Sequence, residues 1–208
     1  KQVIVATDDT RILDTVKQSG HQVMMTRADH VSGTDRIAEV ALAQQWSDDA
    51  IIVNVQGDEP LIEAVLIAEV ANTLSNHPES VMATACHAIH SKADFLNPNI
   101  VKVVLDAQNN ALYFSRAPIP YPRDAFAANS DLPENMPIYR HIGIYAYRAK
   151  FLKQYASIQP SMLERIESLE QLRVLHHGYK ISVSISQNAP AAGVDTQEDL
   201  DYVRSVMS

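Results

Sequence analysis

The sequence of 208 residues predicts a mixed α/β protein, and two observations lead to this expectation. In the first 90 residues, short apolar runs alternate with amphipathic stretches, as in a parallel sheet with helical crossovers. In the second half, short apolar runs and a hairpin pattern are typical of a β-rich lobe. No repeat or obvious linker separates the halves, so we expect one domain with an inserted β-rich lobe.

The first half predicts strands that alternate with helices. Ile12 and Val16 recur at helical spacing, and Gly20 provides a C-terminal stop for that helix. The β-branched run at 51–55 suits a strand covered on both faces, and Pro60 cannot continue its ladder. The expected strands are 1–6, 22–25 and 51–55, and the expected helices are 8–19, 34–46 and 64–74, with a polar loop at 26–36.

The second half predicts a hairpin, a long irregular segment and a closing helix. Residues 107–110 separate two apolar runs as a hairpin turn does. The proline-rich stretch 117–137 is too long for a simple connector, so we expect a flap or an interface. Thr196 and Asp199 are spaced like a helix-capping pair. The expected strands are 81–89, 101–106, 111–115, 138–148 and 180–186, and the expected helices are 149–156, 161–176 and 196–207.

Composition excludes several classes of protein. The formal net charge of -8 and the absence of a basic stripe argue against nucleic acid as a partner. One cysteine, Cys86, cannot form an internal disulfide, which fits a reducing cytoplasm. No apolar run reaches membrane-spanning length, and no secretory signal opens the sequence. We therefore expect a cytoplasmic protein that binds neither nucleic acid nor membrane.

Two aspartates are candidates for a metal site. Asp58 follows the strand predicted at 51–55, and ligands of open α/β sheets bind outside the carboxyl ends of strands. Asp195 precedes the last predicted helix. Mg²⁺ in phosphate chemistry takes one or two carboxylates, with phosphates and water as its other ligands. The alternative is that each aspartate only caps the helix that follows it.

The polar loop at 26–36 is a candidate phosphate or nucleotide site. Ser32, Gly33 and Thr34 allow a ligand to approach the backbone at a helix start, and Arg27 and Arg36 can address phosphate or base. The loop does not match the Walker pattern. The alternative is a solvated loop that leads into a well-capped helix.

A third group suits an anionic sugar, because guanidinium binds carboxylate through two parallel hydrogen bonds. Its members are Arg116, Arg123, Arg140, His141, Tyr145, Glu170, Gln171 and Arg173. Strand alternation puts His141 and Tyr145 on one face, whereas Arg140 points the other way, as a structural residue would. Glu167, Glu170 and Gln171 share one helix face, for which a solvated surface is the alternative.

Several motifs occur together in a characteristic order. They are Thr-Arg-Ala-Asp-His-x-Ser-Gly-Thr-Asp-Arg, Val-Asn-Val-Gln-Gly-Asp-Glu-Pro, Asn-Pro-Asn-x-Val-Lys-Val-Val, Tyr-Phe-Ser-Arg-Ala-Pro-Ile-Pro, Arg-His-Ile-Gly-Ile-Tyr, Leu-Glu-Gln-Leu-Arg-Val-Leu and Gly-Val-Asp-Thr-x-Glu-Asp-Leu. Along its whole length the sequence resembles the CMP-Kdo synthetases, the 3-deoxy-manno-octulosonate cytidylyltransferases of Gram-negative lipopolysaccharide synthesis. Each motif is weak alone, but the set is highly specific.

The resemblance implies a Rossmann-like nucleotide-diphospho-sugar transferase fold with a mixed, mainly parallel sheet, and a homodimer formed by the β-rich half. It implies transfer of a cytidylyl group from CTP to Kdo with Mg²⁺ held by Asp58 and Asp195. Residues about 1–90 would bind nucleotide, about 91–190 would bind sugar and form the dimer, and the helix in 191–208 would pack on the first half. The implied nucleotide residues are Arg27, Ser32, Gly33, Thr34, Arg36, Gln56 and Thr84, and the implied Kdo residues are Arg116, Arg123, His141, Tyr145, Glu170 and Gln171.

One departure from the family pattern concerns the start of the sequence. The relatives begin with a further strand and a loop of the type Pro-Ala-Arg-x-x-Ser-x-Arg-Leu-Pro-Gly-Lys, whereas Lys1 corresponds to their second strand. We expect a form that truly lacked this loop to lose most catalysis, because charges that neutralise the triphosphate would be absent. The alternatives are another sugar-acid cytidylyltransferase, such as a CMP-sialic acid synthetase, or a non-catalytic nucleotide-binding module.

Overall fold

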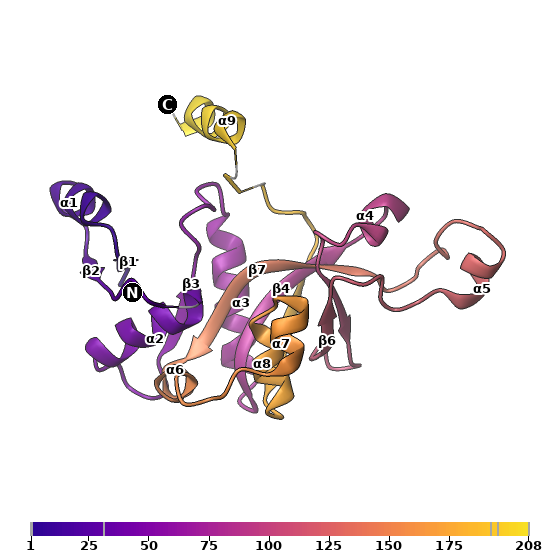
Figure 1. Ribbon diagram of the computed structural model, residues 1–208, viewed down its shortest axis with the longest axis horizontal. Helices are drawn as coiled ribbons and strands as arrows, with labels where there is room; N and C mark the ends of the chain where they lie inside the picture. Colours follow the sequence, from indigo (N-terminus) through magenta and orange to yellow (C-terminus); the bar gives the residue numbers. More distant parts are fainter. Residues whose placement is uncertain (1, 31, 192, 195, 208) are drawn as a thin grey trace. The chain divides into compact units, whose positions relative to one another are not determined.

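The computed structural model describes residues 2–30, 32–191, 193–194 and 196–207 (Figure 1). The chain divides into two compact units. Unit 1 comprises 1–50 and 148–159, and unit 2 comprises 51–147 and 160–208. The boundaries of these units differ from those of the nucleotide-binding part predicted at 1–90 and the sugar-binding part predicted at 91–190. Those two parts were defined by function, and their assignment stays a prediction.

Unit 1 is built on a pair of parallel strands with helices. Its elements are β1 (Val5–Thr7), α1 (Thr10–Gln18), β2 (Val23–Met25), α2 (Gly33–Ala43) and α6 (Ala149–Tyr155). Helix α1 begins at Asp9, whose side chain accepts a hydrogen bond from the Arg11 amide, and a turn with Gly20 at a φ of 76° follows it. Helices α2 and α6 pack on each other through buried side chains that include Ala38, Phe151 and Leu152.

Unit 2 contains a mixed six-stranded sheet in the order β6-β5-β7-β4-β8, with β3 also paired to β7 (Figure 1). Its strands are β3 (Ile51–Asn54), β4 (Ser80–Ala88), β5 (Lys102–Leu105), β6 (Ala111–Ser115), β7 (Tyr139–Arg148) and β8 (Lys180–Ser186). The mixed α/β class is confirmed. Antiparallel pairing is nevertheless more prominent than in the mainly parallel sheet that we expected, because β7 pairs antiparallel with both β4 and β5.

Unit 2 has six helices in its described residues. They are α3 (Ala64–Asn76), α4 (Lys92–Leu96), α5 (Arg123–Ala127), α7 (Met162–Glu167), α8 (Gln171–His176) and α9 (Gln197–Met207). Of these, α3 and α8 contact this sheet. Leu66, Val70 and Leu74 recur every four residues along α3, so one stripe is buried against sheet residues such as Ala85 and Ile144. No helix in the described ranges has the length and apolarity that a membrane span requires.

Two predicted boundaries change for local reasons. The helix expected at 161–176 is two helices, because Ser168 adopts a left-handed φ of 53° and ends α7. The irregular stretch at 117–137 contains the short helix α5, and Phe126 from this helix packs on Phe95 at a ring distance of 6.3 Å. The capping pair is confirmed, since the Thr196 and Asp199 side chains bond to each other's backbone amides.

Candidate active site

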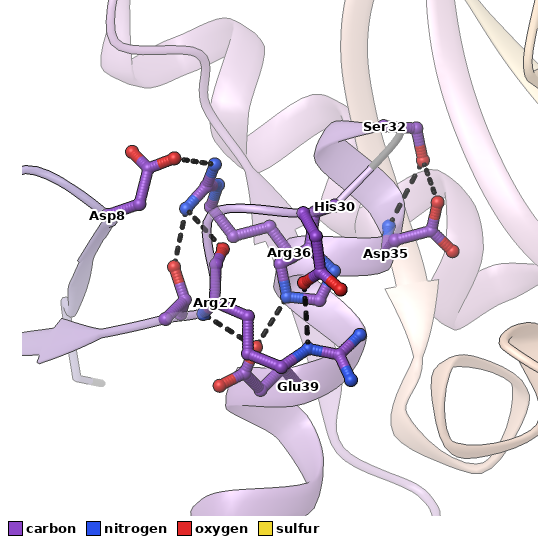
Figure 2. A network of polar contacts seen from close by, with 9 residues as sticks. Asp8, Arg27, His30, Ser32, Asp35, Arg36 and Glu39 are labelled. Atoms are coloured by element: carbon purple, nitrogen blue, oxygen red, sulfur yellow. Dashed lines mark hydrogen bonds and ion pairs between the residues drawn. The ribbon is translucent and has the colours of Figure 1, made fainter.

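The loop before α2 is arranged by the start of that helix (Figure 2). Ser32 is the N-cap residue, and its hydroxyl accepts a hydrogen bond from the Asp35 amide at 3.2 Å. The same hydroxyl donates to the Asp35 carboxylate at 2.7 Å. Gly33 begins the helix and is exposed, whereas Thr34 is buried. The capped-helix alternative is therefore confirmed for Ser32, and it does not exclude a nucleotide at the same helix end.

Arg36 joins the ends of both strands of unit 1 (Figure 2). Its guanidinium donates to Thr26 Oγ1 at 2.5 Å and to Asp8 Oδ2 at 3.0 Å. The hydrogen bond from Arg36 lowers the pKa of Asp8. Because its donors already serve the protein, Arg36 shapes the loop in this structure, and the predicted contact with nucleotide stays a prediction.

Glu39 anchors the backbone of the same loop, one helical turn after Arg36 (Figure 2). Its carboxylate accepts from the Arg27 amide at 3.2 Å and from the ring of His30. The His30 contact lowers the pKa of Glu39. Sequence reasoning missed Glu39, although its spacing of three residues from Arg36 puts both on one helix face.

The side chain of Arg27 extends from this anchored backbone toward solvent. Its side chain is 69% exposed and forms an ion pair with Asp29 at 3.2 Å. An exposed pair of this kind is weak, so the guanidinium can exchange Asp29 for an anionic ligand. Arg27 is therefore the residue of this loop with the most accessible positive charge for the predicted nucleotide.

The turn after β3 presents Asp58 at the surface of unit 2. Asp58 is exposed, and no described residue hydrogen bonds to its carboxylate. The N-cap of the next helix is Glu63, so the expectation that Asp58 might only cap that helix is wrong. In the same turn, Gln56 Nε2 donates to the Gly143 carbonyl at 3.4 Å, which links this turn to β7.

The segment before Asp195 lies against this turn. The Val194 amide donates to the Asp58 carbonyl at 2.8 Å. A Cβ atom on Gly193 would lie 3.0 Å from the same carbonyl oxygen, so the close approach favours glycine. Asp195 itself lies outside the described residues. A shallow hollow beside this turn is lined by Gln56, Glu59, Ile62, Ile142, Gly143, Ile144 and Pro190.

His141, Tyr145 and Thr84 meet where β4 pairs with β7. A bulge at Thr84 and Ala85 shifts the register, so Thr84 faces Tyr145 while Ala85 faces Ile142. Thr84 is fully buried; its hydroxyl lies 2.9 Å from His141 Nε2 and 2.7 Å from the Ile144 carbonyl. The rings of His141 and Tyr145 lie 5.3 Å apart, as expected for residues on one face.

Burial decides the charge of His141. Desolvation lowers its pKa to about 3, and Phe114 packs edge-on at 5.0 Å from the ring. The imidazole is therefore neutral at pH 7 and offers one donor and one acceptor. Thr84 is buried in the sheet beneath this ring. Thr84 can therefore affect nucleotide binding only by positioning the His141 ring and the backbone of β7. Burial likewise raises the pKa of Cys86 to about 12, which agrees with a packing role.

Arg116 is held on several sides at the end of β6. Its backbone amide donates to Glu167 Oε2 at 2.9 Å, and its Nε donates to the Glu167 carbonyl at 2.8 Å. Its Nη1 donates to the Pro98 carbonyl at 3.2 Å, and its own carbonyl accepts from Lys102. Sequence reasoning assigned neither Lys102 nor Glu167 to the site, although Lys102 lies within the Asn-Pro-Asn-x-Val-Lys-Val-Val motif.

The remaining members of the sugar group separate into different environments. Arg123 is exposed at the start of α5. Glu170 is half-buried at the N-cap of α8, and the buried Gln171 Nε2 has no hydrogen-bond partner among the described residues. Arg173 forms a buried ion pair with Glu164, so it is structural. Arg140 is exposed on the face opposite His141, as expected.

Comparisons with known proteins identify the family. A sequence profile of the family described as cytidylyltransferase matches residues 1–181. The chain belongs to the cytidylyltransferase family. A solved structure of CMP:2-keto-3-deoxy-manno-octonic acid synthetase complexed with CTP is 42% identical, with a TM-score of 0.87. The match covers 100% of this cytidylyltransferase and 80% of that structure.

A second solved structure has a similar fold at low sequence identity. The 4-diphosphocytidyl-2C-methyl-D-erythritol synthase structure has a TM-score of 0.60 at 8% identity, and the match covers 100% of this cytidylyltransferase and 81% of that chain. At this identity the likeness concerns the fold alone. The predicted nucleotide-diphospho-sugar transferase fold is confirmed, whereas the roles of individual site residues stay predictions.

Proposed function

We propose that the protein transfers the cytidylyl group of CTP to Kdo, giving CMP-Kdo and pyrophosphate. The observation that carries this proposal is the 42% identity, over the whole chain, to a CMP:2-keto-3-deoxy-manno-octonic acid synthetase that binds CTP. The anomeric C2 hydroxyl of Kdo attacks the α-phosphorus of CTP. A new P–O bond forms, the bond from the α-phosphorus to the oxygen that bridges to the β-phosphate breaks, and pyrophosphate leaves with that electron pair. The proton of the hydroxyl passes to water.

The loop before α2 is the proposed nucleotide site. Arg27 supplies an accessible positive charge, while Arg36 and Glu39 hold the loop backbone in position. The N-terminus of α2, which begins at Gly33 and Thr34, suits an anionic or hydroxyl-bearing ligand. Gln56 is a further proposed nucleotide-binding residue.

The group around His141 is the proposed sugar-acid site. Arg116 and Arg123 are suited to the carboxylate of Kdo, because guanidinium forms paired hydrogen bonds with carboxylate. His141 is neutral, so it serves as a hydrogen-bonding partner of sugar hydroxyls and not as a fixed cation. Tyr145, Glu170 and Gln171 add hydroxyl, carboxylate and amide groups, and Gln171 Nε2, to which no described residue hydrogen bonds, suits a ligand oxygen.

Asp58 and Asp195 are the proposed ligands of Mg²⁺. The exposed Asp58 carboxylate, to which no described residue bonds, fits a hard cation that prefers oxygen ligands. Among the described residues, no group of three acidic, His or Cys side chains is arranged to hold a metal, which fits an ion that takes its other ligands from phosphate and water. When bound, Mg²⁺ neutralises triphosphate charge and activates the attacking hydroxyl.

We also propose a homodimer formed by the β-rich part of unit 2, acting in the cytoplasm in lipopolysaccharide synthesis. The resemblance of the whole sequence to the CMP-Kdo synthetases supports this setting. Sedimentation equilibrium tests the assembly, and a mass equal to one chain would overturn the dimer.

Pyrophosphate release tests the reaction directly. The natural protein, expressed in full, is incubated with CTP and Mg²⁺, with Kdo, with sialic acid or with no acid. We expect release only with Kdo, and loss of release after chelation of the metal. Release with sialic acid but not with Kdo would reassign the substrate, and CTP binding without release would favour a non-catalytic module.

A further inference from the structure

Lys102 is a fully buried lysine at the start of β5, with 0% of its surface exposed. Its ammonium donates to three backbone carbonyls, those of Asn97 at 2.9 Å, Ile100 at 2.6 Å and Arg116 at 2.7 Å. An ammonium has three N–H donors and no acceptor, so this set satisfies it completely. The lysine therefore joins the turn at 97–100 to the backbone of Arg116.

That turn also bonds to the side chain of Arg116. The Asn97 side chain accepts from the Asn99 amide at 2.9 Å, and its carbonyl accepts from the Ile100 amide at 3.2 Å. Between these residues, the Pro98 carbonyl accepts from Arg116 Nη1 at 3.2 Å. By holding both ends of the turn, Lys102 sets the position of the carbonyl that orients the guanidinium.

Glu167 completes the support from α7. Its carboxylate accepts from the Ser115 hydroxyl at 2.6 Å and from the Arg116 amide at 2.9 Å, and its carbonyl accepts from Arg116 Nε at 2.8 Å. The guanidinium is thus held at Nε and Nη1, while Nη2 has no partner among the described residues. A guanidinium held at Nε and Nη1 keeps Nη2 for an anionic ligand.

Stability alone does not account for a lysine at this position. Burial lowers the pKa of Lys102, because the charged form loses its hydration. A buried charge is weak evidence for stability, since an apolar side chain of similar volume often serves a core equally well. What an apolar side chain cannot do is bond three carbonyls and so fix Arg116.

We propose that Lys102 is a positioning residue that orients Arg116 for the carboxylate of the sugar acid. The inference rests on the proposed function, because it takes Arg116 as a substrate-binding residue. Lys102 does not touch the substrate; it acts through the Arg116 carbonyl and through the 97–100 turn. Its loss therefore weakens binding of the acid and leaves binding of CTP unchanged.

Steady-state kinetics of Lys102→Met with both substrates varied test the proposal. We expect the KM for Kdo to rise about tenfold, which corresponds to about 1.4 kcal/mol, and the KM for CTP to stay within about twofold. The matched control is Lys180→Met, which removes an exposed lysine from β8 of the same unit and leaves both values unchanged. An equal rise in both KM values, or none, would overturn the proposal.

A double-mutant cycle with Arg116→Ala separates positioning from general damage. If Lys102 acts through Arg116, Lys102→Met has little further effect on the KM for Kdo once Arg116 is removed. Full additivity of the two changes would contradict the inference. If Lys102→Met fails to fold, Lys102→Gln replaces it in the same cycle, since a side-chain amide has two donors for the three carbonyls that the ammonium bonds.

Pyrophosphate release by the unmodified protein distinguishes a failure of the proposed function from a failure of this inference. Absence of Kdo-dependent pyrophosphate release from that protein would overturn both the proposed function and this inference. Normal release, with additive effects of Lys102→Met and Arg116→Ala, would overturn the inference alone.

Discussion

Removing one partner of the buried ion pair between Arg173 and Glu164 is expected to destabilise helices α7 and α8. Arg173 Nε and Nη2 bond to the two carboxylate oxygens at 2.9 and 2.5 Å, and the side chains are 5% and 13% exposed. Arg173→Met leaves the Glu164 charge without its cation in a largely dry site. Breaking a buried pair in this way costs about 3–5 kcal/mol.

The lower end of that range applies here. Glu164 keeps one hydrogen bond, from the Ser161 amide at 3.2 Å, in the capping box of α7. We therefore expect Arg173→Met to lose about 3 kcal/mol of unfolding free energy. At 2–4 °C per kcal/mol for a chain of this size, the melting temperature should fall by about 6–12 °C.

Calorimetry and urea unfolding at pH 7 measure this change. The control Arg165→Met removes an exposed arginine of α7, the helix that carries Glu164, and should change stability by less than about 0.5 kcal/mol. Replacing both partners, as Arg173→Met with Glu164→Met, should recover most of the loss, because no unpaired charge remains. A loss below about 1 kcal/mol in the single variant, or a double variant as unstable as the single one, would refute this reasoning.

Three further predictions concern the site. Asp58→Asn should lower kcat/KM at least about 100-fold, because a metal ligand supplies several kcal/mol, while the melting temperature stays unchanged; normal turnover would contradict the metal role. Glu39→Gln should raise the KM for CTP about tenfold by loosening the Arg27 backbone, whereas the KM for Kdo stays constant, and an unchanged CTP value would reject this. The pKa of His141 is depressed in the folded protein, so below about pH 6.5 the unfolded chain takes up a proton at this residue and the folded protein does not. The free energy of unfolding therefore decreases as the pH is lowered. Between pH 7 and 5 this loss of unfolding free energy is about 2 kcal/mol at most, and it should be absent in His141→Gln. Urea unfolding at both pH values measures it, and an equal pH dependence in His141→Gln and the unmodified protein would contradict the prediction.

Local chemistry made much of this protein predictable from sequence. The capping pair of Thr196 and Asp199 and the hairpin turn at 107–110 depend on neighbours along the chain, and both occur where expected. The ordered motifs were specific enough to indicate the cytidylyltransferase family, which the comparisons confirmed. Helix existence was predicted more reliably than helix ends, as the break at Ser168 illustrates.

No local sequence pattern predicts the contacts between residues that are far apart in the chain. Nothing near Lys102 in sequence predicts that its ammonium bonds the carbonyl of Arg116, and nothing near Arg36 predicts its bond to Asp8. The bulge that brings Thr84 beneath His141 depends on the register of two strands.

The sequence by itself therefore determined the elements, the family and the chemical types of the site residues, because these follow from neighbours within a few positions. Only the tertiary structure decided which donors of each arginine are already bonded within the protein. Arg173 is neutralised by Glu164, Arg36 is bonded to Asp8 and Thr26, and Arg116 keeps Nη2 without a partner among the described residues. The physical reason is that a guanidinium's availability depends on the acceptors around it, and chain segments far apart in sequence supply those acceptors.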